Sequence, residues 1–227
     1  MLTRANQSVN RAEIAEAIRH AIQRGDLVPG QRLVEADLGE TFHASRTMIR
    51  YALVDLVHEG LIEHIPNRGA RVRIVGLKEA LQTAEVRTVV ESICVEKAAE
   101  RITDGEIEIF RQIGNEMKVR AESGDTAEFA ELTNQLFHEY VRIADQPVAE
   151  EILIRLRDRN SRHRFRLSYR ADRARVSLPL WLDIIDAICN RDPEAARLAL
   201  GRRSKSAQEA MRALAKEDTV SPWQRSF

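Results

Sequence analysis

The chain has 227 residues, which suffices for one large or two modest domains with a sizeable core. Hydrophobic residues make up 44% of it and charged residues 31%, as in ordinary soluble proteins, and the abundant Ala, Leu, Arg and Glu favour helices. The formal net charge of +0 at pH 7 excludes a protein that bulk charge holds to nucleic acid, so any such binding needs a local basic patch.

The N-terminal start, MLTRANQSVN, lacks the apolar core of a signal peptide. Apolar runs elsewhere fall short of membrane-spanning length, so we expect a cytoplasmic protein with no membrane contact. Ser8 can cap a first helix, in which Ile14, Ile18 and Ile22 recur every four residues, and Gly25 can end it.

Two further helices are predicted before the chain reaches Gly60. After a turn at DLVPGQRL, the segment VEADLGETF can form a short helix with Leu38 and Phe42 inward. Ser45 can cap the next helix, SRTMIRYALVDLVHEG, and Gly60 can end it. The apolar residues of this third helix share one side: Ile49, Ala52, Leu53, Leu56 and Val57.

A β-hairpin is predicted after the third helix. LIEHI and ARVRIV are typical of strands, and PNRG can form the turn between them. The alternation in the second strand predicts Val72 and Ile74 on one face and Arg71 and Arg73 on the other. Three short helices and a hairpin are the outline of a winged helix-turn-helix, in which the second helix of the turn motif enters the DNA major groove.

The third helix carries arginines in its first turns, where the helix dipole is positive and acids are usually preferred. Arg46 and Arg50 lie one turn apart on one face and suit guanine, whereas the hydroxyls of Ser45 and Thr47 suit phosphate. The hairpin adds basic residues with no acid between them: Arg68, Arg71 and Arg73. These features predict a local DNA-binding surface, and the alternative is a solvated helix start with surface arginines.

The sequence from residue 18 to residue 72 resembles the N-terminal domain of GntR-family transcription regulators. It contains, in order, G-x-L-x-P-G-x-x-L, S-R-T-x-x-R-x-A-L-x-x-L-x-x-E-G-L-I and N-R-G-A-x-V. The resemblance implies that the third helix contacts bases and phosphates as described, and that a wing tip at Arg68 and Gly69 enters the minor groove. Two residues depart from the family pattern. Met48 replaces a proline, and Tyr51 replaces a glutamate, which removes a possible intramolecular partner of Arg50.

The strand pattern disappears after residue 75, and this change of periodicity marks a domain boundary. Helices are expected at 78–101, 104–122, 126–144, 148–169, 174–190 and 194–216. We therefore predict a winged-helix domain at 1–75, a helical domain at 76–216 and a flexible tail at 217–227. Cys94 and Cys189 lie in apolar helical patterns and are expected to be buried, reduced thiols.

Residues 78 to about 212 resemble the FCD ligand-binding domain of the FadR-like subgroup. The markers are EVRTVVESICVEKAAE, AELTNQLFHEYVRIADQPVAEEIL and DAICNRDPEAARLAL. The resemblance implies a helical bundle that binds an effector in a central pocket and forms a dimer. The resemblance also implies a candidate metal position, because many members of the subgroup hold a divalent metal in this pocket with one Asp and three His.

The metal-site pattern departs from the family in this chain. The Asp position holds Asn134, His138 follows, and the two later His positions hold Trp181 and Arg203. One imidazole and one amide are poor anchors for a first-row metal, so we expect no metal and no cofactor. We hypothesise that Arg203 and Arg87 replace the metal's positive charge and bind an acidic effector. Asn134 and His138 would orient this effector, and Trp181 would form an apolar wall.

Simpler alternatives stay open for these residues. Trp181 can fill the vacated space while Arg203 faces solvent or a surface acid, and Arg87 can form an intrahelical pair with Glu91. The arginine-rich stretch RLRDRNSRHRFRLSYRADRAR can form a second nucleic-acid surface. A solvated helix face, with some arginines facing acids of a partner helix, is favoured for it, because no aromatics interleave to stack on bases.

The predicted protein is mainly α, homodimeric and not an enzyme: a repressor that binds palindromic double-stranded operator DNA. A small organic acid in the helical domain would shift its recognition helices. The first alternative is a metal-responsive regulator of the same family with a rebuilt metal site. The second is a helical-bundle enzyme with His138 as general base, although no nucleophile motif or phosphate loop accompanies it.

Overall fold

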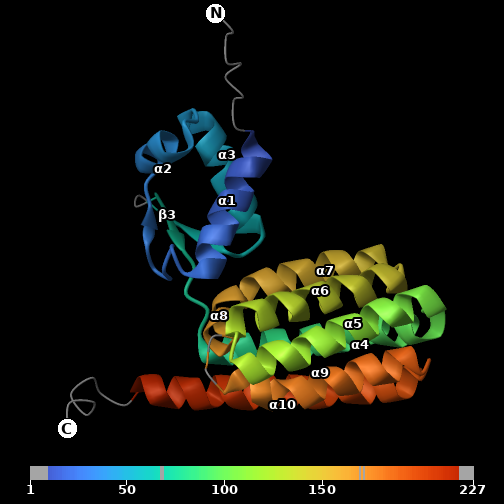
Figure 1. Ribbon diagram of the computed structural model, residues 1–227. Coiled ribbons are helices and arrows are strands. Elements are labelled where there is room, and N and C mark those ends of the chain that lie inside the picture. The colour runs from blue at the N-terminus through green and yellow to red at the C-terminus, as the bar shows by residue number, and fades with distance from the viewer. Residues whose placement is uncertain (1–9, 67–68, 169, 171, 220–227) are drawn as a thin grey trace, which may run out of the picture. The chain divides into compact units, whose positions relative to one another are not determined.

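The computed structural model describes residues 10–66, 69–168, 170 and 172–219, and it is mainly helical (Figure 1). The chain divides into two compact units, Met1–Gly76 and Leu77–Phe227. Each unit has its own hydrophobic core. Every helix in the described part of the chain is too short or too polar to cross a membrane.

The first unit combines three helices with a small antiparallel sheet. Its elements, in chain order, are α1 (Arg11–Arg24), β1 (Arg32–Leu33), α2 (Glu35–Phe42), α3 (Arg46–His58), β2 (Ile62–Ile65) and β3 (Gly69–Val72). The strands pair in the order β1-β3-β2, with Leu33 opposite Ala70 and Ile62 opposite Val72. This is the predicted winged helix-turn-helix with one additional strand, because β1 lies in the segment that was expected to be a turn.

The core of the first unit is apolar and confirms the predicted spacing on α1. Ile14, Ile18 and Ile22 are all buried, and they share one cluster with Ile49 and Leu56 of α3. The side chains expected to face inward from α2 are partly buried against this cluster: Leu38 and Phe42. The core therefore fixes which side of α3 remains for solvent.

The cap of α1 differs from the prediction. Asn10, rather than Ser8, is the N-cap, and its side chain accepts a hydrogen bond from the backbone N–H of Glu13 at 3.0 Å. The Glu13 carboxylate in turn accepts from the backbone N–H of Asn10 at 2.8 Å, which completes a capping box. Ser8 itself lies outside the described residues.

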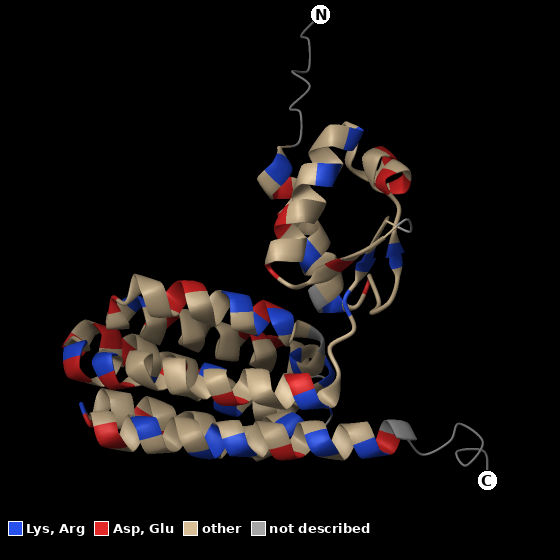
Figure 2. Ribbon diagram, turned by 180° about the vertical axis from the view of Figure 1, so that it is seen from behind, with Lys and Arg blue, Asp and Glu red and all other residues tan. Residues whose placement is uncertain are grey.

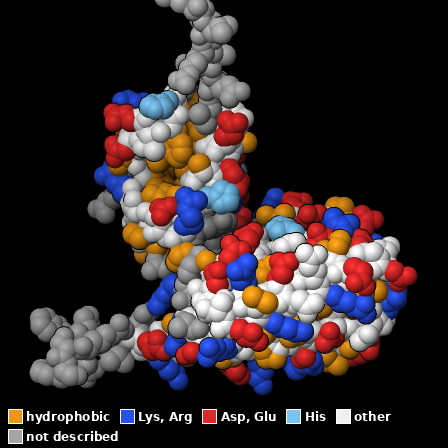
Figure 3. All heavy atoms as spheres, viewed as in Figure 1, with side chains coloured by type: hydrophobic (Ala, Val, Ile, Leu, Met, Phe, Trp, Pro, Cys, Tyr) orange, Lys and Arg blue, Asp and Glu red, His pale blue; other side chains and the backbone are white. Residues whose placement is uncertain are grey.

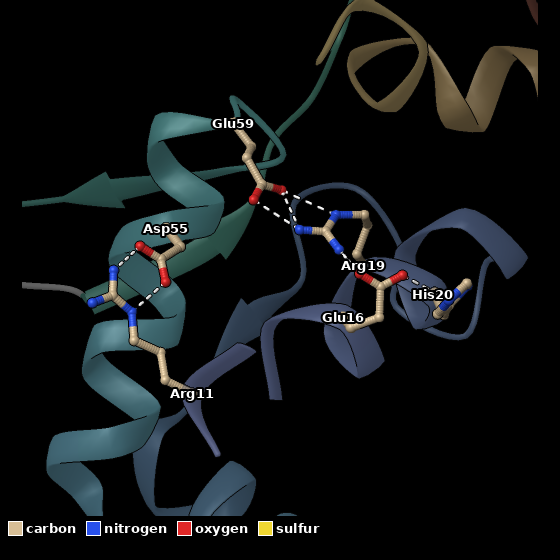
Figure 4. Close-up of polar contacts among 6 residues, drawn as sticks. All are labelled: Arg11, Glu16, Arg19, His20, Asp55 and Glu59. Atoms are coloured by element: carbon tan, nitrogen blue, oxygen red, sulfur yellow. Dashed lines mark hydrogen bonds and ion pairs between the residues drawn. The ribbon is translucent and has the colours of Figure 1, made fainter. Parts of the chain in front are cut away.

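Two arginines of α1 form ion pairs with acids on α3 and at its C-terminal end (Figure 4). Arg11 pairs with Asp55, and Arg19 donates to Glu59 from Nε at 3.1 Å and from Nη2 at 2.8 Å. Because these pairs lie at two separate points along α1, they supplement the apolar contacts that hold α3 in a fixed orientation.

The second unit is a helical bundle. Its helices are α4 (Leu77–Arg101), α5 (Asp104–Ser123), α6 (Thr126–Ala144), α7 (Pro147–Arg159), α8 (Ser161–Ser168), α9 (Arg173–Cys189) and α10 (Pro193–Thr219). α4 packs against α6, α7, α9 and α10, so residues on α4 can reach the interior between several helices. α5 begins and ends close to its predicted bounds. Thr103 is its N-cap and forms a capping box with Glu106, and Gly124, whose φ is +75°, is its C-cap.

Three details of the second unit differ from the sequence-based expectation. The helix expected at 148–169 is divided at Asn160, a buried residue whose Nδ2 donates to the carbonyl of Ala80 at 2.9 Å. α10 extends to Thr219 and thus into the segment predicted to be a flexible tail. The thiols of Cys94 and Cys189 are free, as predicted, but Cys189 is only partly buried.

Candidate functional sites

The start of α3 presents four of the predicted DNA-contacting residues to solvent. Ser45 caps the helix, because its Oγ accepts a hydrogen bond from the backbone N–H of Met48 at 3.3 Å. Ser45, Arg46, Thr47 and Arg50 are all exposed. The first N–H groups of a helix have few partners within it and carry the positive end of its dipole. This surface can therefore bind phosphates and the acceptor groups of base edges.

Arg50 has an intramolecular partner that the sequence analysis missed. Its Nε donates to Oε1 of Glu35 at 3.2 Å, and its Nη2 donates to Oε2 at 3.0 Å. This interaction outweighs partial burial and lowers the pKa of Glu35, and the nearby charge of Arg46 acts in the same direction. Tyr51 thus removes one possible acidic partner of Arg50, and Glu35 of α2 supplies another carboxylate.

The hairpin is less basic than the sequence suggests, although Figure 2 shows basic residues along the strands and acidic residues on α2. Arg71 donates from Nε to Oε1 of Glu63, its neighbour on β2, at 2.7 Å. Arg32, which the sequence analysis overlooked, lies opposite Arg71 on β1 and is exposed. Gly69 begins β3 with a φ of +82°, which favours glycine. Arg68 lies outside the described residues, so its contact with DNA stays a prediction.

A hollow of about 440 Å³ in the first unit is lined by residues of α3 and of the sheet. Figure 3 shows apolar side chains gathered on this unit. The polar and charged residues of its lining come from β1, α2, α3 and the hairpin: Arg32, Glu35, Arg50 and His64. Both members of the Glu35–Arg50 pair thus line this hollow.

The helical unit contains a cavity of about 100 Å³. Five of its helices each contribute one arginine to the lining: Arg87 (α4), Arg157 (α7), Arg164 (α8), Arg173 (α9) and Arg203 (α10). Glu91 is the one acid among the described residues that line it, so positive charges exceed negative ones by four. Such an excess in a partly desolvated space favours an anionic ligand.

Glu91 is the buried centre of the polar contacts in this cavity. Its carboxylate lies 2.8 Å from Nη2 of Arg87 and 3.7 Å from Nη2 of Arg203, and it accepts a hydrogen bond from the Tyr140 hydroxyl. Burial alone would raise the pKa of Glu91, but the two guanidinium charges and the Tyr140 hydrogen bond lower it below its ordinary value. Glu91 is therefore an anion at neutral pH. The intrahelical Arg87–Glu91 pair exists, but it is buried rather than solvated.

Arg87, Trp181 and Arg203 all line the cavity, and their contact with an effector stays a prediction. Trp181 is buried, and the central carbon of the Arg203 guanidinium lies 4.3 Å from the centroid of its ring. The alternative in which Arg203 faces solvent is therefore wrong. Within the described structure, the Nε atoms of Arg87 and Arg203 and Oδ1 of Asn160 are buried without a hydrogen-bond partner. Unpartnered buried groups cost free energy, so a polar ligand here would stabilise the unit.

Asn134 and His138 do not line the cavity, contrary to the hypothesis. Oδ1 of Asn134 accepts a hydrogen bond from Arg157, whose guanidinium carbon lies 3.7 Å from the centroid of the Phe137 ring. Arg157 lines the cavity in place of Asn134. His138 is exposed, with its ring edge-on to Phe137 at 5.2 Å. The physical reason is the helix rotation of about 100° per residue, which turns His138 away when Phe137 faces the core.

These positions do not fit a divalent first-row metal. The Asn134 oxygen is engaged by a guanidinium, Trp181 offers no suitable ligand atom, and Arg203 carries a positive charge. The His, Cys, Asp and Glu residues that the structure describes form no group of three that could hold a metal ion.

The arginine-rich stretch from residue 155 to residue 175 was predicted to be a solvated face, and this prediction is wrong for three of its members. Arg157 is buried, and Arg164 and Arg173 line the cavity. Burial lowers the pKa of Arg164 to about 10, so its guanidinium keeps its charge at neutral pH. The excess of arginines over acids in this stretch, which holds only Asp158 and Asp172 as acids, is the signal that could have indicated a cavity lined by arginines.

Comparisons with known proteins assign both units. Residues 10–72 match the model for bacterial regulatory proteins of the gntR family, and residues 82–205 match the model for the FCD domain. The HTH-type transcriptional repressor RspR of Escherichia coli strain K12 is 25% identical over 213 residues, which cover 94% of this chain and 93% of that protein. The Nta operon transcriptional regulator of Aminobacter aminovorans is 28% identical over 180 residues, 78% of this chain and 83% of the relative.

Solved structures support the same fold. The structure of E. coli McbR/YncC has a TM-score of 0.79 at 19% identity and covers 90% of this chain and 98% of its own. A GntR regulator from Rhodococcus sp. RHA1 has a TM-score of 0.71 at 22% identity, and the match covers 89% of this chain and 97% of that one. The FCD match spans more than half of the 227 residues, and the DNA-binding match lies before it. The chain therefore belongs to the GntR family of bacterial transcriptional regulators, in the group that carries an FCD domain, and is not an enzyme.

Proposed function

We propose that this regulator is a repressor whose homodimer binds palindromic operator DNA, and that a small organic acid in the arginine-lined cavity releases it. The excess of arginines over acids in that cavity is the observation that carries the effector part. The exposed basic start of α3 supports the DNA part. A similar protein, RspR of E. coli, is named a transcriptional repressor.

The charge of the cavity favours an acid. Arg87 and Arg203 share one carboxylate, that of Glu91, and each keeps an unpartnered Nε. A guanidinium presents paired N–H donors that match the two oxygens of a carboxylate. An incoming carboxylate would therefore meet unsatisfied donors and relieve repulsion among the guanidiniums.

The size of the cavity favours a compact ligand. Its volume of about 100 Å³ is below the ~150 Å³ of an engineered cavity that accepts benzene. The buried Trp181 ring supplies an apolar wall, and the neutral polar residues Thr88, Ser177 and Ser204 also line the cavity. A short organic acid with few carbon atoms matches this combination of size, charge and polarity.

α4 links the cavity to the DNA-binding unit through the chain. It begins at Leu77, directly after the first unit ends at Gly76, and it carries Arg87 and Glu91. An effector that binds two arrangements of α4 with different affinity will shift the balance between them. The same difference in affinity then couples effector binding to operator binding.

An apolar stripe on α4 supports a dimer. Val86, Val89 and Ile93 recur at helical spacing and are 54%, 69% and 40% exposed. A second copy of the chain would cover such a stripe around a two-fold axis, and a two-fold protein matches a palindromic operator.

The test combines DNA release with ligand stabilisation. A duplex from the region flanking the regulator's own gene is bound to the purified protein and challenged with mono-, di- and tricarboxylic acids, with amines and alcohols of equal size as controls. At least one acid is expected to release the duplex and to raise the melting temperature of the free protein. Release by amines or alcohols alone, or no stabilisation by any acid, would contradict the proposal.

A further inference from the structure

Glu35 is the first residue of α2, and its carboxylate meets Arg50 on the exposed side of α3. The Glu35 side chain is 35% exposed and the Arg50 side chain 69%. An exposed ion pair of this kind contributes little to folding stability. We therefore ask where the ion pair places the Arg50 side chain.

The pair uses only one edge of the guanidinium. Glu35 accepts from Nε at 3.2 Å and from Nη2 at 3.0 Å, which is the side-on geometry. An arginine has five N–H groups, so after this pairing Nη1 keeps two free N–H groups and Nη2 keeps one. One N–H of Nη1 and the remaining N–H of Nη2 point in parallel from the far end of the side chain. Two such parallel donors match O6 and N7 of guanine.

Glu35 also lies near the other predicted base-contacting residue. Arg46 stands one turn before Arg50 on α3, and its charge acts on the Glu35 carboxylate. Glu35 and Arg50 both line the hollow between α3 and the sheet. The remaining described acids of α2, Asp37 and Glu40, have no ion pair to the α3 arginines in the described structure.

We propose that Glu35 is a positioning residue for DNA recognition, which holds Arg50 in the rotamer that presents its two terminal N–H groups to one base pair of each half-site. The proposal rests on the proposed function, because it requires Arg50 to contact a base. It makes Glu35 a determinant of specificity, although an acid beside DNA phosphates is electrostatically unfavourable. Removing the charge of Glu35 should therefore weaken binding to the specific duplex without weakening binding to unrelated DNA.

The test measures affinity for three kinds of duplex. One is selected by the wild-type protein from a random-sequence pool, the second carries single base-pair changes across one half-site, and the third has unrelated sequence. Glu35→Gln removes the charge and keeps the shape, and Arg50→Ala removes the contact itself. Glu40→Gln is the matched control, because it makes the same charge change on the same helix at an exposed residue.

Glu35→Gln is expected to weaken binding to the selected duplex about two- to tenfold, since a long side chain then has to be immobilised on binding. Binding to unrelated DNA should stay equal or tighten, because a negative charge near the phosphates is gone. The lost discrimination should fall on the same base pair as for Arg50→Ala, and the double variant should lose no more than Arg50→Ala alone. Glu40→Gln should leave discrimination unchanged.

Two results would overturn the proposal in different ways. If Arg50→Ala binds the selected duplex like the wild type, base contact by Arg50 fails and the inference fails with it. If Arg50→Ala loses discrimination but Glu35→Gln tightens selected and unrelated DNA equally, Glu35 acts only as a charge and the DNA assignment survives. Thermal unfolding of each variant shows whether the fold is retained.

Discussion

The guanidinium of Arg203 stacks on the ring of Trp181, with 4.3 Å between its central carbon and the ring centroid. The contact joins α10 to α9 at the cavity, and the Arg203 side chain is 12% exposed. These are the two positions at which the family resemblance places metal-binding histidines. The aromatic face holds the cation by a cation–π contact, and both residues line the cavity.

Replacing Arg203 should weaken effector binding. Arg203→Ala removes a charge-assisted hydrogen-bond donor worth about 1.5–3 kcal/mol, so affinity for the releasing acid should fall roughly ten- to a hundredfold. Calorimetric titration with the acid found in the release assay measures this. Arg202→Ala is the control, since the neighbouring Arg202 pairs with Asp183 at 2.9 Å on the exposed side. Unchanged affinity in Arg203→Ala, or near-stoichiometric metal that survives dialysis, would contradict the role assigned to Arg203.

Neutralising Glu91 should destabilise the helical unit. Glu91→Gln leaves Arg87 and Arg203 without their shared buried counter-ion, which should lower the free energy of unfolding by about 3 kcal/mol at neutral pH. Urea denaturation measures this value. Glu96→Gln, on the same helix, removes a weaker surface partner of Arg197 and should change stability by less than about 1 kcal/mol.

The stability that Glu91 provides should also depend on pH. Its pKa is lowered on folding from the ordinary 4.5, so the unfolded state takes up its proton first. The contribution is complete above the unfolded value and is lost as the pH falls through the lower folded value. The gap between wild type and Glu91→Gln should therefore be constant at neutral pH and shrink below about pH 4.5. A gap that grows on acidification would contradict the assignment of a charged Glu91.

Most elements of the fold could be predicted, because apolar spacing and capping residues act locally. The exceptions depend on contacts between distant residues. β1 has two residues, Arg32 and Leu33, and exists only because β3 pairs with it. The break between α7 and α8 comes where Asn160 bonds to the backbone of Ala80, a partner far away in the sequence.

In the candidate site, too, some residues could be predicted from the sequence and others depend on contacts between distant residues. Arg87, Trp181 and Arg203 could be identified from the resemblance, but Arg157 could not, because its burial depends on α7 packing beside Phe137 of α6. His138 was misplaced for a related reason. A sequence places residues on one flank of a helix, whereas the direction of that flank is set by neighbouring helices.

Removing Arg46 should reduce sequence specificity. Arg46→Ala is expected to cost about 1–3 kcal/mol on the selected duplex and much less on unrelated DNA, because contacts to bases carry the specificity. Arg71→Ala should weaken both duplexes slightly and evenly, since Glu63 already neutralises Arg71 at 2.7 Å. Fluorescence anisotropy at several salt concentrations measures both effects. Equal losses for Arg46→Ala on both duplexes would contradict base contact by Arg46.

The stripe on α4 gives a prediction about assembly. Val89 is 69% exposed in the single chain, and a partner copy would bury it. Val89→Asp would place a charge in that apolar contact, so the protein should become monomeric at micromolar concentration and lose most of its operator affinity. Val119→Asp on α5 is the matched control, because Val119 is 58% exposed and lies outside the stripe.

Light scattering gives the mass of each variant, and unfolding experiments show whether each variant folds. A wild-type monomer that binds the operator one chain at a time would contradict the dimer, and a dimeric Val89→Asp variant would place the interface elsewhere.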